Sequence, residues 1–308
     1  MGSPKEEDRR LPEEKPRWVE DYIPLDKSWI IRMGVLDLFN GNKDRIKNFL
    51  GSQKDLGGDL LALKGVIETW GTDEPVDVGE SATLYRILQF ASWKLNLNKK
   101  FITHGTLTER LKNMTKDPNT VNLSLNQLLA LPEKTSQWAT ASVLLGNKER
   151  IPNPPYKLQV SFDAVEHWNK QRQHGKTWEP IHDTTIQEQA DVFLAMIQGK
   201  KMPFTPMQAE DYCFAYTFGY MSREEGEAKW PNLRGHESNR FEMERILTRA
   251  KAGEEIDSED HRVVWAIAMW GQVNSKNVKF SYPDAVNKTW PKFWAFLEYA
   301  KSLQKLSE

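Results

Sequence analysis

Cysteine is almost absent from the chain, since Cys213 is the only one in 308 residues. One cysteine cannot form an internal disulfide framework, and it cannot supply the paired cysteines of a zinc-finger site. The composition therefore predicts a protein of a reducing compartment, and we expect a cytoplasmic one. Because Cys213 lies in an apolar helical pattern from Tyr212 to Met221, we expect it to be a buried packing residue.

An excess of charge of one sign is also lacking, with 42 Lys and Arg against 43 Asp and Glu. Without a basic surplus, neither nucleic acid nor an acidic membrane is an expected partner. No apolar run approaches the roughly 20 residues that a membrane-spanning helix requires. The 12 tryptophans, which could stack on bases, lie in apolar helical patterns and are expected in the core. Any anion-binding site must therefore be formed by a local cluster of cations, since the chain has no net positive charge.

Short strand-like runs alternate with helical ones, which predicts an α/β chain. The expected strands cover residues 45–50, 76–78, 101–104, 158–161 and 278–282. The expected helices cover residues 60–70, 82–95, 138–145, 164–173, 187–197, 212–221, 241–252, 263–270 and 291–303. Residues 1–16 are charged and proline-bearing, and we expect a disordered tail there. Two domains are expected: a discontinuous one of residues 17–26 and 181–308, and one of residues 27–180.

Polar residues stand at several predicted helix entrances, including Ser81, Ser136 and Asp260. Such residues are ordinarily plain N-caps, although a helix N-terminus can also complete a cradle for phosphate or carboxylate. Cations occur beside these entrances. If several of them converge, the cost of burying like charges together would favour an anionic ligand.

Several ordered motifs resemble those of the EPSP synthase family. The string from Asn232 to Arg240, Asn-Leu-Arg-Gly-His-Glu-Ser-Asn-Arg, looks like the family's Asn-x-Arg followed by Lys-Glu-Ser/Thr-Asp-Arg. Downstream, Asp260-His261-Arg262 resembles its Asp-His-Arg, and the run from Asn287 to Pro291 resembles its Lys-Ser/Thr-Phe-Pro ending. Several motifs in the right order are more specific than one.

The first half of the chain carries the same resemblance. Asp26-Lys27-Ser28 through Arg32 resembles Ser-Lys-Ser-x-x-x-Arg, and Ser81-Ala82-Thr83 with Arg86 resembles Ala-Gly-Thr with its trailing arginine. Thr108-Glu109-Arg110 is similar to the Glu-Arg-Pro element, and Thr135-Ser136-Gln137 is similar to Ser-Ser-Gln. Ser161 follows. The resemblance thus covers residues 27–291.

The resemblance implies a fold and a reaction. The fold would be α/β, with two domains built from βαβαββ repeats, an inside-out α/β barrel with some repeats trimmed. The reaction would transfer the enolpyruvyl group of phosphoenolpyruvate to the 5-hydroxyl of shikimate 3-phosphate and release phosphate, as a step of aromatic amino-acid biosynthesis. No metal and no organic cofactor would be required. We expect a monomer, because no coiled-coil seam is visible.

The resemblance also assigns roles to individual residues. The phosphoenolpyruvate set would be Lys27, Arg110, Gln137, Arg240, Arg262 and Lys288. The shikimate 3-phosphate set would be Lys27, Ser28, Arg32, Thr135, Ser136, Gln137, Ser161 and Asn232. Glu237 would transfer protons, with Lys27 and His236 beside it, because the reaction needs an acid and a base in contact with both substrates.

Three positions depart from the family pattern. His236 replaces a lysine, so a fixed charge becomes a titratable one. Ala82 replaces a glycine, and its Cβ predicts crowding of the inhibitor glyphosate and therefore weak inhibition. The family's carboxylate beside the acceptor hydroxyl has no clear match, and Asp183 and Asp211 are the candidates. Two alternative functions therefore stay open: a catalytically degenerate anion-binding homologue, and an enolpyruvyl transferase with a different acceptor.

Overall fold

The computed structural model describes residues 17–114, 116–131, 136–173, 178–235 and 238–307. The expected tail of residues 1–16 lies outside them. The structure is 64% helical with only 3% strand, so the expected α/β fold of βαβαββ repeats is wrong. So little strand cannot build the sheets of such a barrel, and the inside-out architecture is absent from the described residues.

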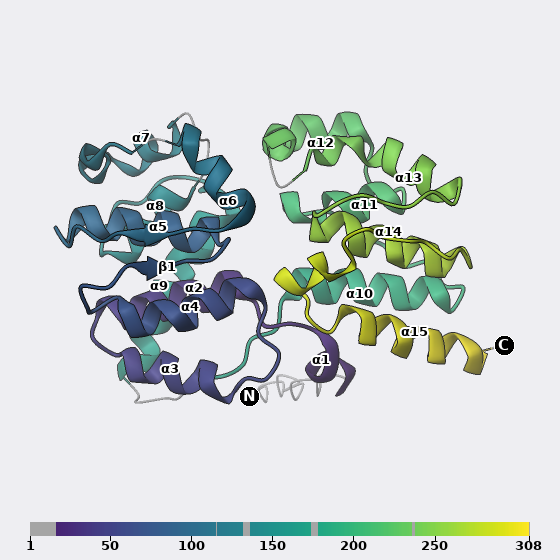
Figure 1. Ribbon diagram of the computed structural model, residues 1–308, viewed down its shortest axis with the longest axis horizontal. Coiled ribbons are helices and arrows are strands. Elements are labelled where there is room, and N and C mark those ends of the chain that lie inside the picture. The colour runs from purple at the N-terminus through teal and green to yellow at the C-terminus, as the bar shows by residue number, and fades with distance from the viewer. Residues whose placement is uncertain (1–16, 115, 132–135, 174–177, 236–237, 308) are drawn as a thin grey trace, which may run out of the picture.

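The helices form two lobes that lie side by side (Figure 1). The first lobe comprises residues 27–173 and the second comprises residues 17–23 and 184–307. The elements of the first lobe are α2 (Lys27–Phe39), α3 (Lys43–Ser52), α4 (Gly58–Thr69), α5 (Ala82–Lys94), α6 (Gly105–Arg110), η1 (Leu111–Asn113), η2 (Pro118–Asn122), α7 (Leu125–Leu129), α8 (Gln137–Leu144) and α9 (Tyr156–Gln173). The elements of the second lobe are α1 (Arg17–Tyr22), α10 (Thr184–Ile197), η3 (Ala209–Asp211), α11 (Tyr212–Thr217), α12 (Arg223–Lys229), η4 (Pro231–Gly235), η5 (Arg240–Glu242), α13 (Met243–Lys251), α14 (His261–Val273), η6 (Pro283–Lys288) and α15 (Phe293–Ser307).

The strands of the described residues form one short parallel pair. β1 (Val76–Asp77) pairs with β2 (Phe101–Ile102), which confirms the extended conformation expected in these two places. The strand expected at residues 278–282 is wrong, because that segment contributes only an isolated bridge between Ile256 and Phe280.

Two other expected strands are helices. Residues 45–50 lie in α3, where Ile46, Phe49 and Leu50 are buried at the i, i+3, i+4 spacing of a helix face. Residues 158–161 lie near the start of α9, where Leu158 and Phe162 are both buried, four positions apart. Windows of four to six residues were too short to separate the two periods.

Each lobe packs its helices around a buried central helix. In the first lobe, all residues of α8 from Trp138 to Leu144 are buried, and α5 and α9 pack against it. In the second lobe, α14 is buried from His261 to Gly271. A helix that is buried on every side must be surrounded by other elements, so the neighbouring helices take the place that sheets would fill. Cys213 is buried in the second core, as expected, and burial raises the pKa of its thiol to about 12.

None of the helices in the described ranges combines the length and the apolar character needed to cross a bilayer.

Candidate functional site between the lobes

The chain crosses between the lobes twice, and the two crossing segments pair with each other. Asp26 N donates to Ile181 O at 2.8 Å, and Asp183 N donates to Pro24 O at 2.9 Å. Each segment ends in an aspartate that caps a helix. The Asp26 carboxylate accepts from Trp29 N at the start of α2, and the Asp183 carboxylate accepts from Ile186 N at the start of α10. The entrances of α2 and α10 are therefore held together where the lobes meet.

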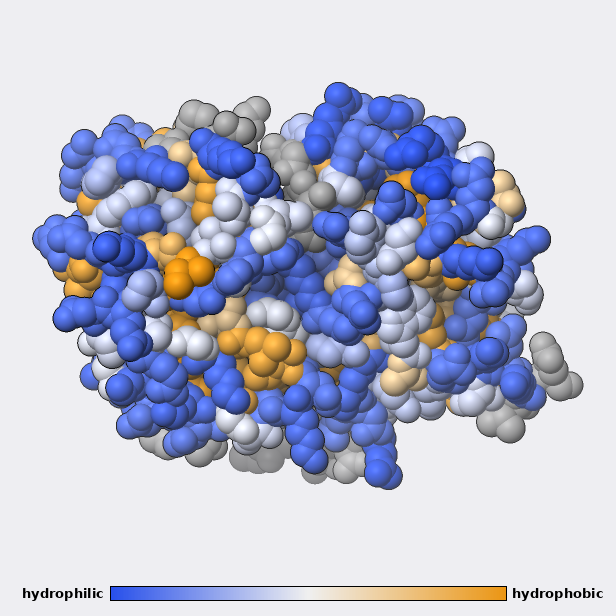
Figure 2. Space-filling view, viewed as in Figure 1, coloured by the Kyte–Doolittle hydropathy of each residue, from blue (hydrophilic) through white to orange (hydrophobic). Residues whose placement is uncertain are grey.

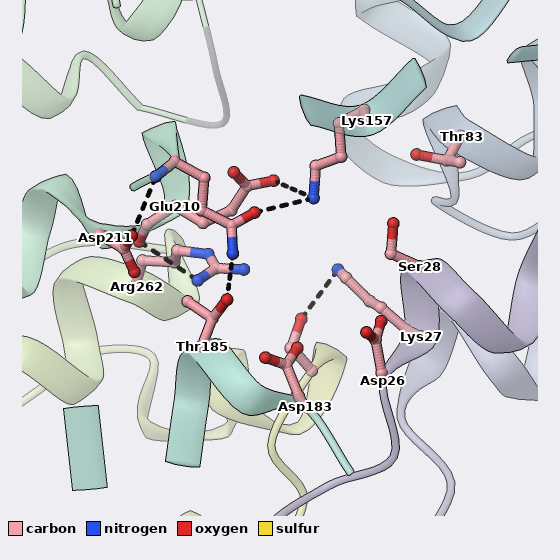
Figure 3. A network of polar contacts seen from close by, with 12 residues as sticks. Asp26, Lys27, Ser28, Thr83, Lys157, Asp183, Thr185, Glu210, Asp211 and Arg262 are labelled. Atoms are coloured by element: carbon pink, nitrogen blue, oxygen red, sulfur yellow. Dashed lines mark hydrogen bonds and ion pairs between the residues drawn. The ribbon is translucent and has the colours of Figure 1, made fainter. Parts of the chain in front are cut away.

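We call the polar residues gathered there the interlobe site (Figure 3). Its members are Asp26, Lys27, Ser28, Lys157, Asp183, Thr185, Glu210 and Arg262. Asp26 and Asp183 come from the crossing segments, and the others come from α2 and α9 of the first lobe and from α10, η3 and α14 of the second. Thr83, at the start of α5, faces the same region in Figure 3.

Lys27 connects the first and last motifs of the sequence. Its Nζ donates to Asp59 Oδ2 at 2.8 Å and to Thr289 Oγ1 at 3.0 Å, and Thr289 lies 262 positions away. The neighbouring Lys288 places its Nζ 3.8 Å from Glu80 Oε2. Burial raises the pKa of the Asp59 carboxyl, but the charge and hydrogen bond of Lys27 outweigh burial and hold that pKa below its usual range.

Arg32 is buried and organises its neighbours. Its Nε donates to Ser161 Oγ at 2.9 Å, its Nη1 to Ser28 Oγ at 2.7 Å, and its Nη2 to Lys157 O at 2.9 Å. Burial lowers the pKa of its guanidinium to about 10. The structure thus joins Ser28, Arg32 and Ser161, three residues of the expected shikimate 3-phosphate set. With only 1% of Arg32 exposed, we assign it a positioning role rather than ligand contact.

Lys157 and Glu210 form an ion pair between the lobes, with Lys157 Nζ 3.0 Å from Glu210 Oε1. Arg262 Nη1 donates to Glu210 O at 3.2 Å. Burial raises the pKa of the Glu210 carboxyl, yet the positive charges of Lys157 and Arg262 outweigh burial, and the pKa lies well below its usual range. Lys157 and Glu210 are absent from the residues selected by sequence, because no motif includes them.

Asp183 is the titratable carboxylate of the site. Burial and the negative charge of Asp26 raise its pKa to about 6, while Arg262 and the hydrogen bond from Ile186 N act in the opposite direction. Asp211 is the other candidate for the carboxylate beside the acceptor hydroxyl, but its side chain already accepts local hydrogen bonds. It accepts from Gln189 Nε2 at 2.9 Å and from the backbone N of Met207 and Gln208 at 2.9 and 3.0 Å.

Gln137 and Arg86 form a second polar group within the first lobe. Arg86 Nη1 donates to Gln137 Oε1 at 2.7 Å, and Gln137 Nε2 donates to Thr83 Oγ1 at 2.6 Å. Ser136 precedes α8 and makes no side-chain cap bond there. Ser81 is the N-cap of α5 and accepts from Leu84 N, and its side chain also hydrogen-bonds to the Asp59 carboxylate.

Arg240 is committed to a buried ion pair. Its Nε and Nη2 donate to the two carboxylate oxygens of Asp260 at 2.8 and 3.1 Å, and Ser238 Oγ donates to Asp260 at 3.0 Å. Asp260 also caps α14 by accepting from Arg262 N. This arrangement fixes the entrance of α14 and, with it, the position of Arg262.

Several expected site residues are not placed in the interlobe site. Arg110 ends α6, and no hydrogen bond or ion pair joins its side chain to another described residue. Thr135, His236 and Glu237 lie outside the described residues, as does the side chain of Asn232.

The charges of the interlobe site are balanced internally. Lys27 lies beside Asp59, Lys157 beside Glu210, and Lys288 near Glu80. These cations therefore do not require an anionic ligand to neutralise them. The support for an anion site is weaker than the sequence led us to expect. Lys27 and Lys157 nevertheless keep 24% and 33% of their side chains exposed, so both remain partly accessible from the solvent.

No protein-family model, no curated protein and no solved structure matches the chain.

Proposed function

We propose that the chain is an enolpyruvyl transferase that binds phosphoenolpyruvate and shikimate 3-phosphate at the interlobe site. The observation that carries the proposal is the hydrogen bond from Lys27 to Thr289. These residues belong to the first and last of the ordered motifs, and the motifs were recognised without reference to the helical fold. Their meeting between the lobes is what a site shared by both halves of the sequence requires.

The cations would hold the donor substrate. Lys27, Lys288 and Arg262 offer three positive charges from both lobes for a ligand that carries a carboxylate and a phosphate. The departing phosphate gains negative charge as its bond to the enol carbon breaks, so charge-assisted donors fixed around it stabilise the transition state more than the ground state. Ser28, held by Arg32, would bind the acceptor's phosphate.

Proton transfer would be shared between two carboxylates. The acceptor hydroxyl adds to the enol carbon and loses its proton, while the methylene carbon gains one; phosphate then leaves as the methyl group returns a proton. Asp183, with a pKa of about 6, is suited to accept the hydroxyl proton near neutral pH. Glu237 is our choice for the carbon, from the motif alone.

The test is acceptor-dependent phosphate release from phosphoenolpyruvate. We expect Lys27→Ala to lower kcat/KM by at least about 100-fold, and Glu237→Gln to do the same. Lys292→Ala is the matched control, because Lys292 Nζ also pairs between the lobes, 3.0 Å from Asp55, outside the interlobe site. Release that does not depend on shikimate 3-phosphate, or that survives in Lys27→Ala, would contradict the proposal.

The pH profile gives a second check. As pH rises through about 6, Asp183 loses its proton and becomes a competent base, so kcat/KM should rise there. Asp183→Asn should remove that limb of the profile together with most of the activity. If Asp183→Asn kept full activity, a residue other than Asp183 would have to accept the hydroxyl proton.

A non-catalytic anion-binding homologue is the second candidate. The observation in its favour is that Asp59, Glu80 and Glu210 already neutralise the cations that a substrate would need. Saturable binding of phosphoenolpyruvate without phosphate release in the presence of any shikimate 3-phosphate concentration would favour this candidate. The cytoplasmic location stays a prediction under either function.

A further inference from the structure

A second feature of the meeting lobes is a large open cleft. It has a volume of about 900 Å³ and is lined by α4 and the segments around β1 and β2 on one side, and by residues 281–291 of the second lobe on the other. Clefts between about 300 and 1,000 Å³ are typical of sites for small organic ligands, and such sites favour the junction of two structural units. The cleft borders the interlobe site, since its lining includes Asp59, which accepts a hydrogen bond from Lys27.

Apolar side chains line both walls of the cleft. Leu61 and Ala62 of α4 face it from the first lobe, and Tyr282, Pro283 and Ala285 face it from the second. Leu61 is 55% exposed and Tyr282 is 44% exposed, and because both line one cleft they form a shared apolar surface and not single scattered side chains. Figure 2 shows hydrophobic side chains gathered on the border of the first lobe with the second, within a largely hydrophilic face. A ligand with an apolar, ring-sized body would cover them.

The polar lining of the cleft is predominantly acidic. Five carboxylates line it: Asp59, Asp77, Glu80, Glu259 and Asp284. The cationic side chains of the lining are Lys288 and, when protonated, His104, which lies 3.0 Å from Asp77 Oδ2. No hydrogen bond or ion pair joins the side chain of Glu259 to another described residue. The cleft therefore retains negative charge after its internal pairs are counted.

We propose that this cleft binds a small organic cation, an amine attached to an aromatic or similarly apolar body. The apolar walls would take up the body, and Glu259 and Asp284 on the second lobe would face the ammonium group. The cleft shares Lys288 with the proposed phosphoenolpyruvate site, but its five carboxylates outnumber this lysine and favour a cationic ligand over an anionic one. The proposal goes beyond the transferase and does not depend on it.

The experiment compares three probes that share an indole body and differ in charge: tryptamine, its neutral counterpart tryptophol, and the anion indole-3-propionate. Calorimetric titration into the full chain should show saturable one-to-one binding of tryptamine, weaker binding of tryptophol, and the weakest binding of indole-3-propionate. Glu259→Gln and Asp284→Asn should each weaken tryptamine binding about five- to tenfold and leave tryptophol unchanged, as expected for one lost charge near the ammonium. Leu61→Ala, at an exposed position, should weaken all three probes.

Asp257→Asn is the matched control, because Asp257 is exposed on the same segment as Glu259 but does not line the cleft. Binding that ignores probe charge, binding that Asp257→Asn weakens as much as Glu259→Gln does, or no saturable binding at millimolar tryptamine would overturn the proposal. Phosphate release assayed in the same variants separates this failure from failure of the transferase, because Glu259 has no part in the proposed reaction.

Discussion

The ionised Asp183 carboxylate lowers the stability of the folded chain. Burial and the charge of Asp26 raise its pKa from 3.8 to about 6, so the folded chain holds this proton more tightly than the unfolded chain does. Between about pH 4 and 6 the folded state binds more protons, and the free energy of unfolding must fall as pH rises through that window. Carboxylates that are kept despite such a cost are concentrated at functional sites.

Asp183→Asn should therefore stabilise the chain at pH 7 by on the order of 1 to 2 kcal/mol and leave its stability near pH 4 almost unchanged. Asparagine caps helices as well as aspartate does, so the start of α10 is preserved. Urea unfolding at both pH values measures the difference. Asp117→Asn is the control, since Asp117 is an exposed cap of η2. Equal destabilisation by Asp183→Asn at both pH values would contradict the assignment.

Glu210 is the residue that a ligand anion would have to displace. Its carboxylate forms an ion pair with Lys157 and lies near Arg262. Glu210→Gln should therefore tighten phosphoenolpyruvate binding about tenfold, because two cations lose an internal competitor. Calorimetry measures this, with Glu166→Gln as the control for an exposed glutamate that pairs with Lys170. Weaker binding in Glu210→Gln would mean that Glu210 instead orders Lys157 for the ligand.

At the scale of elements, the expected helices were largely confirmed and most of the expected strands were wrong. The helix α2, which carries Lys27 and Ser28, was not among the expected helices. The helices expected at residues 60–70, 82–95 and 263–270 are confirmed as α4, α5 and α14, because their apolar patterns extend over more than two turns. The strands expected at residues 45–50 and 158–161 are wrong because their windows cover fewer than two turns. The resemblance then reinforced the error, since the family fold requires strands between its helices.

Gly226 of α12 tests how this helix packs against Tyr212. A Cβ there would lie 2.2 Å from Tyr212 Cε2, and the Tyr212 ring is buried. Gly226→Ala should therefore lower the free energy of unfolding by about 2 kcal/mol or more, despite alanine's better helix propensity. Gly65→Ala is the matched control in α4, where a Cβ meets nothing within 4 Å, and it should stabilise by about 0.5 to 1 kcal/mol. Denaturant titration of both variants decides; equal effects would show that Tyr212 does not pack against α12.

At the scale of the molecule, several motif residues lie close together although the fold expected from the motifs is wrong. One motif string includes Lys27, Ser28 and Arg32, and the resemblance adds Ser161 without a string of its own. In the structure, Arg32 donates hydrogen bonds to both Ser28 and Ser161. Lys157 and Glu210 were missed because their pairing depends on how the lobes meet, which no local pattern encodes. The division into two independently folding domains stays a prediction, although each lobe has its own buried core.

The most direct test of the account is a calorimetric titration of phosphoenolpyruvate into the wild type, Lys27→Ala and Lys292→Ala. The account predicts saturable binding to the wild type, binding at least about tenfold weaker in Lys27→Ala, and unchanged binding in Lys292→Ala, because only Lys27 belongs to the interlobe site. Absence of binding to the wild type, or equal loss in both lysine variants, would contradict the claim that the lobes share an anion site.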